Sequence, residues 1–405
     1  MTGRVVVLGA GYAGCAAIQS IEAELEDSDT EVVWVSEAPS HLVLHEVHRY
    51  LRNPGVREQI TVPVEEIKSA ETTFVEATVS GLDVGDRTVE LDGADDLDYD
   101  YAVVCLGSRT AFFDIDGLQE YAHTLKSLDD ADRIRDDLTT AAREASTDDP
   151  AQVVVGGAGL TGIQVAGEIA AWRDERDAAF EIHLVEREDE IFSGHDHEFQ
   201  GAIRNKLEAR DVAIETGTAI ESVDAETAHL DGADDVDYDV LVWAGGVTGR
   251  DALSDVDVET DHNRAYADAT LKTSDERVFA IGDAALMHQD DENGPLTEEA
   301  VWETVVNPDT DDVPPPTAEA AWEAGKRIGE NVARDAEGRE LVHWAYTNKG
   351  TLVSVGDAAV AHDVFGIPIN TFSGPAARTL KRAISARWLV TVADWKRAAR
   401  AWPEM

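Results

Sequence analysis

Two glycine-rich turns are the residues of this sequence best suited to chemistry. The first, GAGYAG, begins at Gly9 after the apolar run at residues 5–8, and the second, GAGLTG, begins at Gly157 after residues 153–155. Glycines between a strand and a helix let backbone N–H groups approach a pyrophosphate at the positive end of the helix. Each turn therefore predicts a dinucleotide site. The candidate contacts are Gly9, Gly11, Tyr12, Ala13 and Gly14 in the first turn and Gly157, Gly159, Leu160, Thr161 and Gly162 in the second.

An acidic residue ends a strand-like segment at nearly the same distance after each turn. Glu37 closes EVVWVSE and Glu186 closes FEIHLVE, 28 and 29 residues after the first glycine of their turns. A carboxylate there accepts hydrogen bonds from a ribose diol and repels the 2′-phosphate of NADP. The second site is therefore predicted to favour NADH over NADPH, although the neighbouring Arg187 weakens that preference. The alternative, an exposed acid at a strand end, stays open for either residue in so acidic a chain.

The elements that position these residues form an internal duplication. Each copy reads as strand, glycine turn, helix, strand with a terminal acid, β-hairpins, and a last strand that enters a glycine turn, at Gly107 or at Gly246. The LDGADD-x-DYD segments that begin at Leu91 and Leu230 differ at one position. We predict an α/β fold with two Rossmann-like dinucleotide-binding domains, β-meander crossovers, and a C-terminal segment that ends in an amphipathic helix.

The length of 405 residues exceeds what a single core supports, and the duplication predicts where the domains divide. The first domain is expected to be discontinuous, with residues 1–112 and 247–333 as its two parts. The second domain, residues 113–246, is inserted between them, and residues 334–405 are expected to form a C-terminal membrane-attachment segment. The acid-rich and proline-rich stretch from Gln289 to Pro316 is predicted to be a loop.

Composition narrows the classes of protein. Against 82 Asp and Glu stand 33 Lys and Arg, a formal charge of −49, and the basic residues comprise 8 Lys and 25 Arg. Such a surface excludes nucleic acid and, over most of the molecule, anionic membrane as partners. Acid-rich, lysine-poor surfaces suit concentrated salt, which screens self-repulsion, so we interpret the chain as halophilic and haloarchaeal. Apolar strand-like runs and nine Trp exclude general disorder.

Cysteine and histidine usage excludes other chemistry. Cys15 and Cys105 lie 90 residues apart without CxxC or zinc spacing, which excludes a disulfide framework and a thiol redox centre and indicates a reducing compartment. His41, His45 and His48 fall at helical spacing, but no further ligand with matching spacing stands near them, so packing is favoured over a metal site. With no catalytic triad, metal cluster or redox cysteine, the chain requires a cofactor to carry a reaction.

Taken in order and spacing, these motifs resemble the type II (non-proton-pumping) NADH:quinone dehydrogenases, within the two-dinucleotide-binding-domain flavoproteins. The resemblance spans nearly the whole chain. It implies that FAD binds the first domain and NADH the second, that a hydride passes from NADH to FAD, and that two electrons pass on to a membrane quinone. The segments that carry it are GAGYAG, SHLVLHEVHRY, DYDYAVVCLGSRTAFFDIDGL, VVVGGAGLTGIQVAGEI, DVLVWAGGVTG, RVFAIGDAA and HWAYTNKGTLVSVG.

The resemblance also implies roles for single residues. Asp283 is expected to bind the ribityl chain of the flavin, His41 to lie close to the flavin, and Lys349, in the KGxL motif, to lie near the flavin and the acceptor. Gln164 and Lys349 are the candidate catalytic residues. The remaining candidate contacts are Glu37, Ala38, Gly107, Ser108, Arg109 and Gly282 for FAD, and Glu186, Gly245 and Gly246 for NADH.

Departures from the family keep other functions open. Gln164 stands where the family usually has Glu, and Glu319 and Glu323 stand where its quinone motif has Gln. One alternative is therefore a soluble NADH-dependent flavoprotein that reduces a small iron protein or another acceptor, and a second is a redox-sensing nucleotide-binding protein without turnover. Sulfide:quinone oxidoreductases and disulfide reductases are excluded, because the cysteines they need are missing. Cys105 and Leu106 replace the family's Ala-Thr, which we interpret as packing.

The C-terminal region reverses the charge of the chain. Residues 376–402 hold seven basic residues and one acid, Asp394, and their apolar residues recur every three or four positions. Such a helix can lie on an anionic membrane surface, so we predict a peripheral protein at the cytoplasmic face of the membrane, with menaquinone as acceptor. No stretch of the sequence approaches 18 consecutive apolar residues, so no membrane-spanning helix is predicted. The alternative is a helix docked on the protein's own acidic surface or on a second subunit, as in a homodimer. The predicted apolar face comprises Leu380, Ile384, Trp388, Val392, Trp395, Ala399 and Trp402, and the basic residues are Arg378, Lys381, Arg382, Arg387, Lys396, Arg397 and Arg400.

Overall fold

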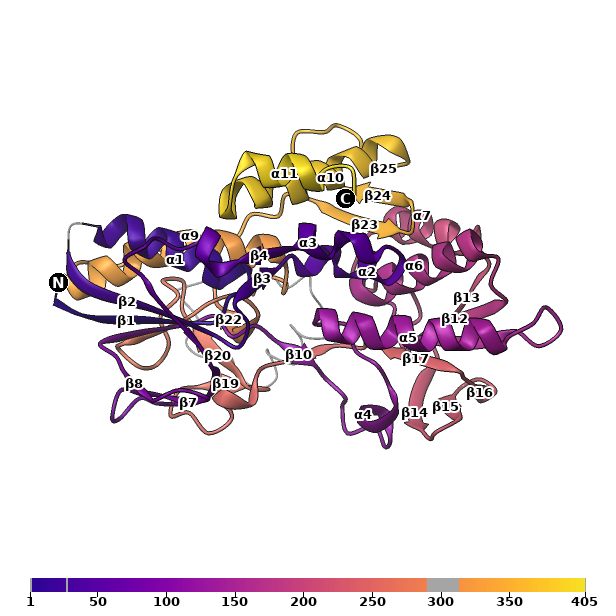
Figure 1. Ribbon diagram of the computed structural model, residues 1–405, viewed down its shortest axis with the longest axis horizontal. Helices are drawn as coiled ribbons and strands as arrows, with labels where there is room; N and C mark the ends of the chain where they lie inside the picture. The colour runs from indigo at the N-terminus through magenta and orange to yellow at the C-terminus, as the bar shows by residue number, and fades with distance from the viewer. Residues whose placement is uncertain (1, 27, 290–312, 405) are drawn as a thin grey trace. The chain divides into compact units, whose positions relative to one another are not determined.

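The computed structural model describes residues 2–26, 28–289 and 313–404, so most of the loop predicted from Gln289 to Pro316 lies outside the described residues. The chain forms two compact units (Figure 1). Each unit is assembled from three separate segments. The first unit comprises Met1–Val43, Thr61–Arg109 and Thr248–Thr347, and the second comprises Leu44–Ile60, Thr110–Val247 and Asn348–Met405.

A five-stranded parallel sheet in the order β21-β9-β1-β2-β5 organises the first unit. Its central strand β1 pairs Val5 with Val32 on one side and with Tyr101 on the other. Residues 5–8 have no exposed surface, because a parallel sheet is covered on both faces, and this explains their unbroken apolar run. The strands are β1 (Thr2–Leu8), β2 (Asp29–Ser36), β5 (Thr73–Glu76), β9 (Tyr101–Val104) and β21 (Val278–Ala280).

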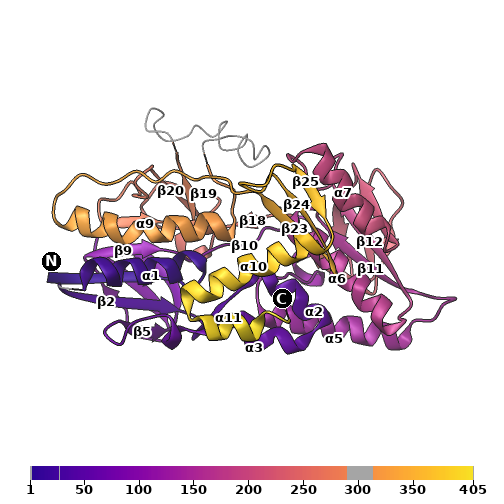
Figure 2. The ribbon, with the colours of Figure 1, turned by 90° about the horizontal axis from the view of Figure 1, so that it is seen from above.

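Two helices, α1 (Tyr12–Leu25) and α9 (Ala318–Ala336), lie side by side in the first unit (Figure 2). Glycines let them approach closely: a Cβ on Gly329 would lie 2.3 Å from the backbone of Ser20, and one on Gly325 would lie 2.6 Å from the carbonyl oxygen of Ala13. The Ser20 hydroxyl donates to the Gly325 carbonyl at 2.8 Å and links the helices. Helix α9 therefore supports the helix that follows the first glycine turn.

The second unit repeats this plan with a four-stranded parallel sheet in the order β13-β12-β11-β17. Helix α6 follows β11, and helix α5 begins with a capping box between Ser127 and Asp130. The repeated plan confirms the predicted pair of Rossmann-like domains. The elements are β11 (Ala151–Gly156), β12 (Phe180–Glu186), β13 (Val212–Thr216), β17 (Val240–Trp243), α5 (Leu128–Glu144), α6 (Leu160–Arg176) and α7 (His197–Glu208).

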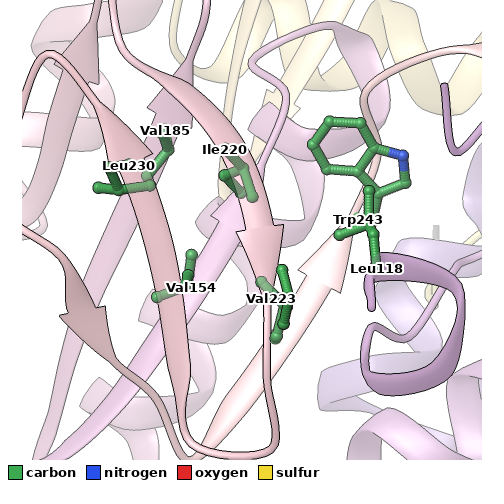
Figure 3. Close-up of a cluster of buried hydrophobic side chains, with 9 residues drawn as sticks. Leu118, Val154, Val185, Ile220, Val223, Leu230 and Trp243 are labelled. Atoms are coloured by element: carbon green, nitrogen blue, oxygen red, sulfur yellow. The ribbon is translucent and has the colours of Figure 1, made fainter. Parts of the chain in front are cut away.

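Both units carry a three-stranded antiparallel meander where the LDGADD segments predicted hairpins. Each has a register shift at the same place, between Val79 and Gly81 in the first unit and between Ile220 and Ser222 in the second. In the second unit the meander covers an apolar cluster in which Trp243 lies beside Leu118 (Figure 3). The strands are β6 (Thr78–Asp83), β7 (Thr88–Asp92) and β8 (Leu97–Asp98), and β14 (Ala219–Val223), β15 (Thr227–Asp231) and β16 (Val236–Asp237).

The second unit also gathers residues from both ends of the chain. Helix α2 (Val47–Arg52) packs on α5 and α6, and the sheet of β23, β24 and β25 packs on α6, where a Cβ on Gly167 would lie 2.7 Å from Val355 Cα. Arg52 ties this packing with ion pairs to Glu168 at 2.8 Å and Asp357 at 3.0 Å. The strands are β23 (Thr351–Val355), β24 (Ala358–His362) and β25 (Thr371–Ser373).

The single C-terminal helix predicted over residues 376–402 is wrong, because the chain forms two helices, α10 (Pro375–Val392) and α11 (Trp395–Ala401). The backbone leaves the helical region at Ala393, and the Asp394 side chain accepts the Arg397 N–H at 2.7 Å and begins the second helix. Among the described helices, none is both long and apolar enough to cross a bilayer.

The remaining described elements are short. They are β3 (Ser40–Leu42), β4 (Thr61–Pro63), β10 (Arg109–Thr110), β18 (Val247–Thr248), β19 (Thr260–Asp261), β20 (Arg264–Ala267), β22 (Ala285–Met287), α3 (Arg57–Ile60), α4 (Leu118–Tyr121), and the 3₁₀ turns Leu44–Glu46, Pro54–Val56, Val64–Glu66, Asp251–Leu253 and Gly282–Ala284.

Candidate functional site

The three glycines of the first turn differ in what a side chain would meet. Gly9 has a φ of +110°, and a Cβ there would lie 2.4 Å from the carbonyl oxygen of Cys105. A Cβ on Gly14 would lie 2.0 Å from the carbonyl oxygen of Gly9, so helix and turn pack backbone to backbone. A Cβ on Gly11 would meet nothing within 4 Å, so the space beside it is open to a ligand. This is the division of roles that a pyrophosphate cradle requires.

Side chains from the neighbouring strands fix the first turn. The Trp34 indole N–H donates to the Gly9 carbonyl at 2.8 Å, and His41 Nδ1 lies 2.9 Å from the Ala10 carbonyl oxygen. His41 is fully buried and meets the Tyr12 ring edge-on at 5.0 Å. Glu37 follows β2 and accepts a hydrogen bond from Arg250 at 3.2 Å, with about half of its side chain exposed. His41 thus contacts the turn at the Ala10 carbonyl and at the Tyr12 ring.

The structure brings two further predicted flavin residues together. The Ser108 hydroxyl donates to Asp283 Oδ2 at 2.9 Å. Gly282 has a φ of +68°, and a Cβ there would lie 2.9 Å from Ala13 Cβ, which places this segment against the start of α1. Arg109 forms an ion pair with Asp251. These residues surround the first turn from the ends of β9 and β21, the edge of a parallel sheet at which ligands bind.

The second turn reproduces the same geometry. Gly157 has a φ of +91°, and a Cβ there would lie 2.7 Å from Gly245 Cα, so the two predicted NADH segments touch. A Cβ on Gly162 would lie 1.8 Å from the Gly157 carbonyl oxygen. A Cβ on Gly159 would meet nothing within 4 Å. Open space again lies beside the middle glycine.

Glu186 is held by backbone rather than by a side chain. Its Oε2 accepts the Ala158 N–H at 2.6 Å, and its Oε1 accepts the Glu188 N–H at 3.0 Å. The carboxylate is therefore fixed at the end of β12 beside the turn. Arg187 is exposed and pairs with Glu188 at 3.0 Å, which partly offsets its charge.

The helices after both turns offer their N-termini to an anion. Neither α1 nor α6 has an acidic residue in its first turn or a side chain that caps its N-terminus, although the chain holds 82 acids. Leu160 and Thr161 stand in the first turn of α6. The N–H groups of the first helical turn and the helix dipole then favour a phosphate. Both turns fit the pyrophosphate of a dinucleotide.

Gln164 belongs to a buried polar cluster within the second unit. Its Nε2 donates to the Ser354 hydroxyl at 3.1 Å, and Lys381 Nζ donates to the same oxygen at 3.2 Å. With both acceptor positions of that oxygen used, its proton points to His48 Nε2, 2.8 Å away. His48 is therefore neutral, with its own proton on Nδ1.

A second hydroxyl extends the polar cluster to a carboxylate. Ser385 donates to Glu46 Oε1 at 2.7 Å, and His45 Nε2 lies 2.8 Å from the Ser385 oxygen. Glu46 is fully buried and also pairs with Arg49. We use the name polar cluster for the residues Gln164, His48, Ser354, Lys381, Ser385, Glu46, His45 and Arg49.

Burial shifts the titration of the polar cluster. It lowers the pKa of Lys381 to about 8 and that of His45 to about 4. Burial and the charge of Lys381 hold the pKa of His48 well below its usual value. Burial alone would raise the pKa of Glu46, but Arg49 and Lys381 outweigh it and hold that pKa low. Near neutral pH the Lys381 ammonium is thus the group closest to losing its proton.

The C-terminal helices do not present the predicted faces. Lys381, expected on a basic surface, is 5% exposed, because it turns inward to Ser354. Trp388 and Val392 are buried in the unit, whereas Trp395 is 67% exposed. The predicted apolar face therefore splits into a docked part and an exposed part. The exposed large apolar residues of this region are Phe365, Ile367, Ile369, Ile384, Val390, Trp395 and Trp402.

The other predicted residues occupy separate places. Glu319 and Glu323 lie one turn apart on α9 of the first unit, and Glu323 pairs with Lys326 at 2.7 Å. Lys349 precedes β23 in the second unit, where its carbonyl accepts the Phe365 N–H at 3.1 Å. Cys105 is buried, as predicted, and burial raises the pKa of its thiol. Within the described ranges, no set of three potential ligands is placed to hold a metal ion.

Sequence reasoning missed most of the polar cluster. His45 and His48 were interpreted as packing residues, and the roles of Glu46, Ser354 and Ser385 were not foreseen. Two signals were available. An acid stands inside the apolar segment LVLHEVH, and Lys381 and Ser385 share a helical face with Trp388, which is a core position.

Comparison with known proteins agrees with this geometry. Residues 3–323 match the pyridine nucleotide-disulphide oxidoreductase family. The chain is 26% identical over 403 residues to the type II NADH:quinone oxidoreductase of Staphylococcus saprophyticus, covering 95% of this chain and 94% of the relative. Among solved structures, NDH2 from Plasmodium falciparum in complex with NADH matches with a TM-score of 0.82 at 15% identity, covering 100% of this chain and 97% of the other. The sulfide:quinone oxidoreductase of Aquifex aeolicus matches with a TM-score of 0.74 at 15% identity, over 97% and 92% of the two chains.

Proposed function

The chain belongs to the pyridine nucleotide-disulphide oxidoreductase family, and from that premise we propose that it is a type II NADH:quinone oxidoreductase. It takes a hydride from NADH onto FAD and passes two electrons to a membrane quinone. The observation that carries this is the pair of open middle glycines, Gly11 and Gly159, each before a helix whose N-terminus no side chain caps. Two such cradles in one chain serve two dinucleotides. The similarity to type II NADH:quinone oxidoreductases supports the choice of reaction.

We assign FAD to the first unit and NADH to the second. In the first, the Gly9 turn holds the pyrophosphate, Glu37 the adenosine ribose, and Asp283, supported by Ser108, the ribityl hydroxyls. Bound FAD supplies a ring system that accepts a hydride and returns its electrons to a second acceptor. The remaining first-unit contacts are Gly11, Tyr12, Ala13, Gly14, Ala38, His41, Gly107, Arg109 and Gly282.

In the second unit, the turn that begins at Gly157 holds the pyrophosphate of NADH and Glu186 its adenosine ribose. Because two backbone N–H groups fix the Glu186 carboxylate, a 2′-phosphate would meet a charge that cannot turn away, which favours NADH over NADPH. Gln164 and Lys349 are proposed to act at the reacting end of the site.

A stopped-flow experiment tests this proposal. Purified protein in molar salt is mixed anaerobically with NADH and then with a menaquinone analogue, while the visible absorbance of the flavin is followed. Bleaching by NADH and fast recovery with the quinone are expected. A flavin that NADH does not bleach would instead indicate a redox sensor without turnover.

A soluble reductase of a small iron protein is the second candidate. Glu319 and Glu323 favour it, because carboxylates on α9 suit a basic protein partner better than a quinone. Bleaching by NADH without recovery in the presence of the menaquinone analogue would support this function and contradict quinone reduction.

We further propose that the protein attaches to the cytoplasmic face of a haloarchaeal membrane, where menaquinone is its acceptor. Exposed tryptophans beside basic residues suit the headgroup region of an anionic bilayer. The exposed pair Trp395 and Trp402 is the target of choice, since deletion of α10 would also remove Lys381 and Ser385 from the polar cluster. The double variant Trp395→Ser, Trp402→Ser should fail to float with anionic vesicles that carry the wild type. Unchanged flotation, or loss of a dimer instead, would contradict membrane attachment through these residues.

A further inference from the structure

Phe113 is an exposed aromatic residue of the second unit. Its exposed fraction is 56%. Its backbone φ is +51°, and that of the next residue, Asp114, is +54°. Bulky residues rarely adopt this left-handed region, and such conformations persist where the surrounding structure enforces them, often at ligand sites. Neither burial nor backbone preference accounts for this position.

A tight turn holds this backbone, because the Ile115 N–H donates to the Phe112 carbonyl at 3.0 Å across Phe113 and Asp114. The segment before the turn is anchored as well. The Trp243 indole N–H donates to the Ala111 carbonyl at 2.7 Å, and the Ala111 N–H donates to the Gly246 carbonyl at 3.1 Å. A Cβ on Gly245 would lie 2.1 Å from the Trp243 ring, and a Cβ on Gly246 would lie 2.7 Å from the Phe113 ring. The paired glycines after β17 thus make room for two aromatic rings. One ring anchors the Ala111 segment, and the other is Phe113 itself.

Strand order tells which half of a dinucleotide passes this point. In the sheet order β13-β12-β11-β17, the glycine turn follows the central strand β11. Glu186, the ribose acid of the adenosine half, ends β12 on one side of it, and Gly245 and Gly246 follow β17 on the other. A ligand whose pyrophosphate lies at the turn and whose adenosine lies toward β12 must extend its other half toward β17.

We propose that Phe113 packs its ring against the nicotinamide riboside half of the bound dinucleotide and is a binding residue for that half. The inference rests on the proposed function, in which the second unit binds NADH. A flat aromatic face stacks on a planar heterocycle, and it attracts the positive charge of the oxidised nicotinamide.

The experiment compares two probes on the flavin-loaded, full-length protein in molar salt. NAD⁺ contains both halves and does not reduce the flavin, whereas ADP lacks the nicotinamide riboside. By titration calorimetry, Phe113→Ala should weaken NAD⁺ binding about tenfold, a typical value for one stacked ring. It should leave ADP binding unchanged within about twofold. Equal weakening of both probes, or no weakening of NAD⁺, would overturn the assignment.

Two companion variants separate binding from folding. Tyr121, an exposed aromatic of α4 in the same connecting segment, supplies the matched control, and Tyr121→Ala should change neither affinity. Phe113→Gly removes the ring and also relieves the left-handed backbone, so it should weaken NAD⁺ binding while the melting temperature stays equal to or above that of the wild type. A lower melting temperature with unchanged NAD⁺ affinity would show that the ring is structural. If the wild type binds neither probe, the proposed function itself fails.

Discussion

The two glycine turns share their backbone and differ in the side chains around them. In both, the first glycine is left-handed and donates its N–H to the carbonyl of the adjacent strand, at 2.7 Å from Gly9 and 2.8 Å from Gly157. The acids beyond the turns differ. Glu37 is half exposed and is paired with the Arg250 side chain, whereas Glu186 accepts two backbone N–H groups.

The shared turn and the different acids suit different parts of the two ligands. A pyrophosphate is common to both dinucleotides, so the cradle repeats after duplication. An exposed carboxylate is screened in salt, so we expect Glu37 to add little to ligand binding in the first unit. A ligand that binds and leaves in each turnover gains more from a carboxylate already fixed in place. We therefore expect the first unit to retain its ligand and the second to exchange it.

The largest effects should come from filling the open space beside the middle glycines. Both residues have a φ near −76°, which alanine adopts freely, so the variants should fold. Gly11→Ala should abolish FAD retention, measured as flavin absorbance per protein. Gly159→Ala should keep FAD but weaken NAD⁺ binding at least a hundredfold, because the methyl group occupies the pyrophosphate position. Loss of both ligands in either variant would contradict the separate assignment of the units.

A control for these variants exists in α7. A Cβ on Gly201 would also meet nothing within 4 Å, but this glycine lies inside a helix. Gly201→Ala should bind both ligands normally and be more stable by about 0.5–1 kcal/mol, since alanine favours helix.

The next largest effect should be the pH dependence of stability that the polar cluster causes through Lys381. Burial lowers the pKa of Lys381 to about 8 from 10.5, so between these values the unfolded chain holds a proton that the folded chain has released. The unfolding free energy of the wild type relative to Lys381→Met should therefore rise with pH across this window, by up to about 3 kcal/mol, and this difference should be constant below pH 8. Urea denaturation of the wild type and of Lys381→Met, at several pH values, measures this. Profiles of the two proteins that run parallel from pH 8 to pH 10.5 would show that Lys381 does not titrate in the window.

A smaller effect should distinguish the two acids. Glu186→Gln keeps the size of the side chain but presents one amide donor to two backbone N–H groups, so the KM for NADH should rise about tenfold with little change in kcat. Glu37→Gln should lower flavin retention by less than about threefold, because its carboxylate is exposed and ion-paired. Equal losses in kcat and KM for Glu186→Gln, or a larger effect at Glu37, would contradict the comparison.

The smallest effect should be that of removing the Arg250 side chain on flavin retention, and it should depend on salt. Arg250→Gln removes the partner of Glu37, whose pair is exposed and screened at high ionic strength. Flavin retention should then fall by less than about twofold in molar salt and by more in dilute buffer. Dialysis at two salt concentrations, followed by flavin absorbance, checks this.

Much of the fold followed from local patterns. The strand before each turn, the acid after it and the paired meanders are short-range signals, and duplication supplied a second copy of each. The C-terminal helix was mispredicted because an apolar repeat continues through Asp394, while the N-cap at that residue begins a new helix.

The polar cluster could not be predicted in the same way. Its members come from residues 45–49, 164, 354 and 381–385, and only tertiary packing brings them together. A serine or a histidine carries no local sign of the partner it will find. Lys381 looked like one more basic residue on a basic helix, and packing against Ser354 decided otherwise.

The two sides of helix α10 are under different constraints. One side, with Lys381 and Ser385, must keep matching Glu46 and Ser354 in its own unit, while the other side, with Ile384 and Val390, faces outward. Residues on the outward side can be substituted one at a time as the environment of the protein changes. The inward side cannot change in this way, because Lys381 contacts Ser354 and Ser385 contacts Glu46. Homologues with very different exposed residues on α10 should therefore still carry compatible pairs at these four positions.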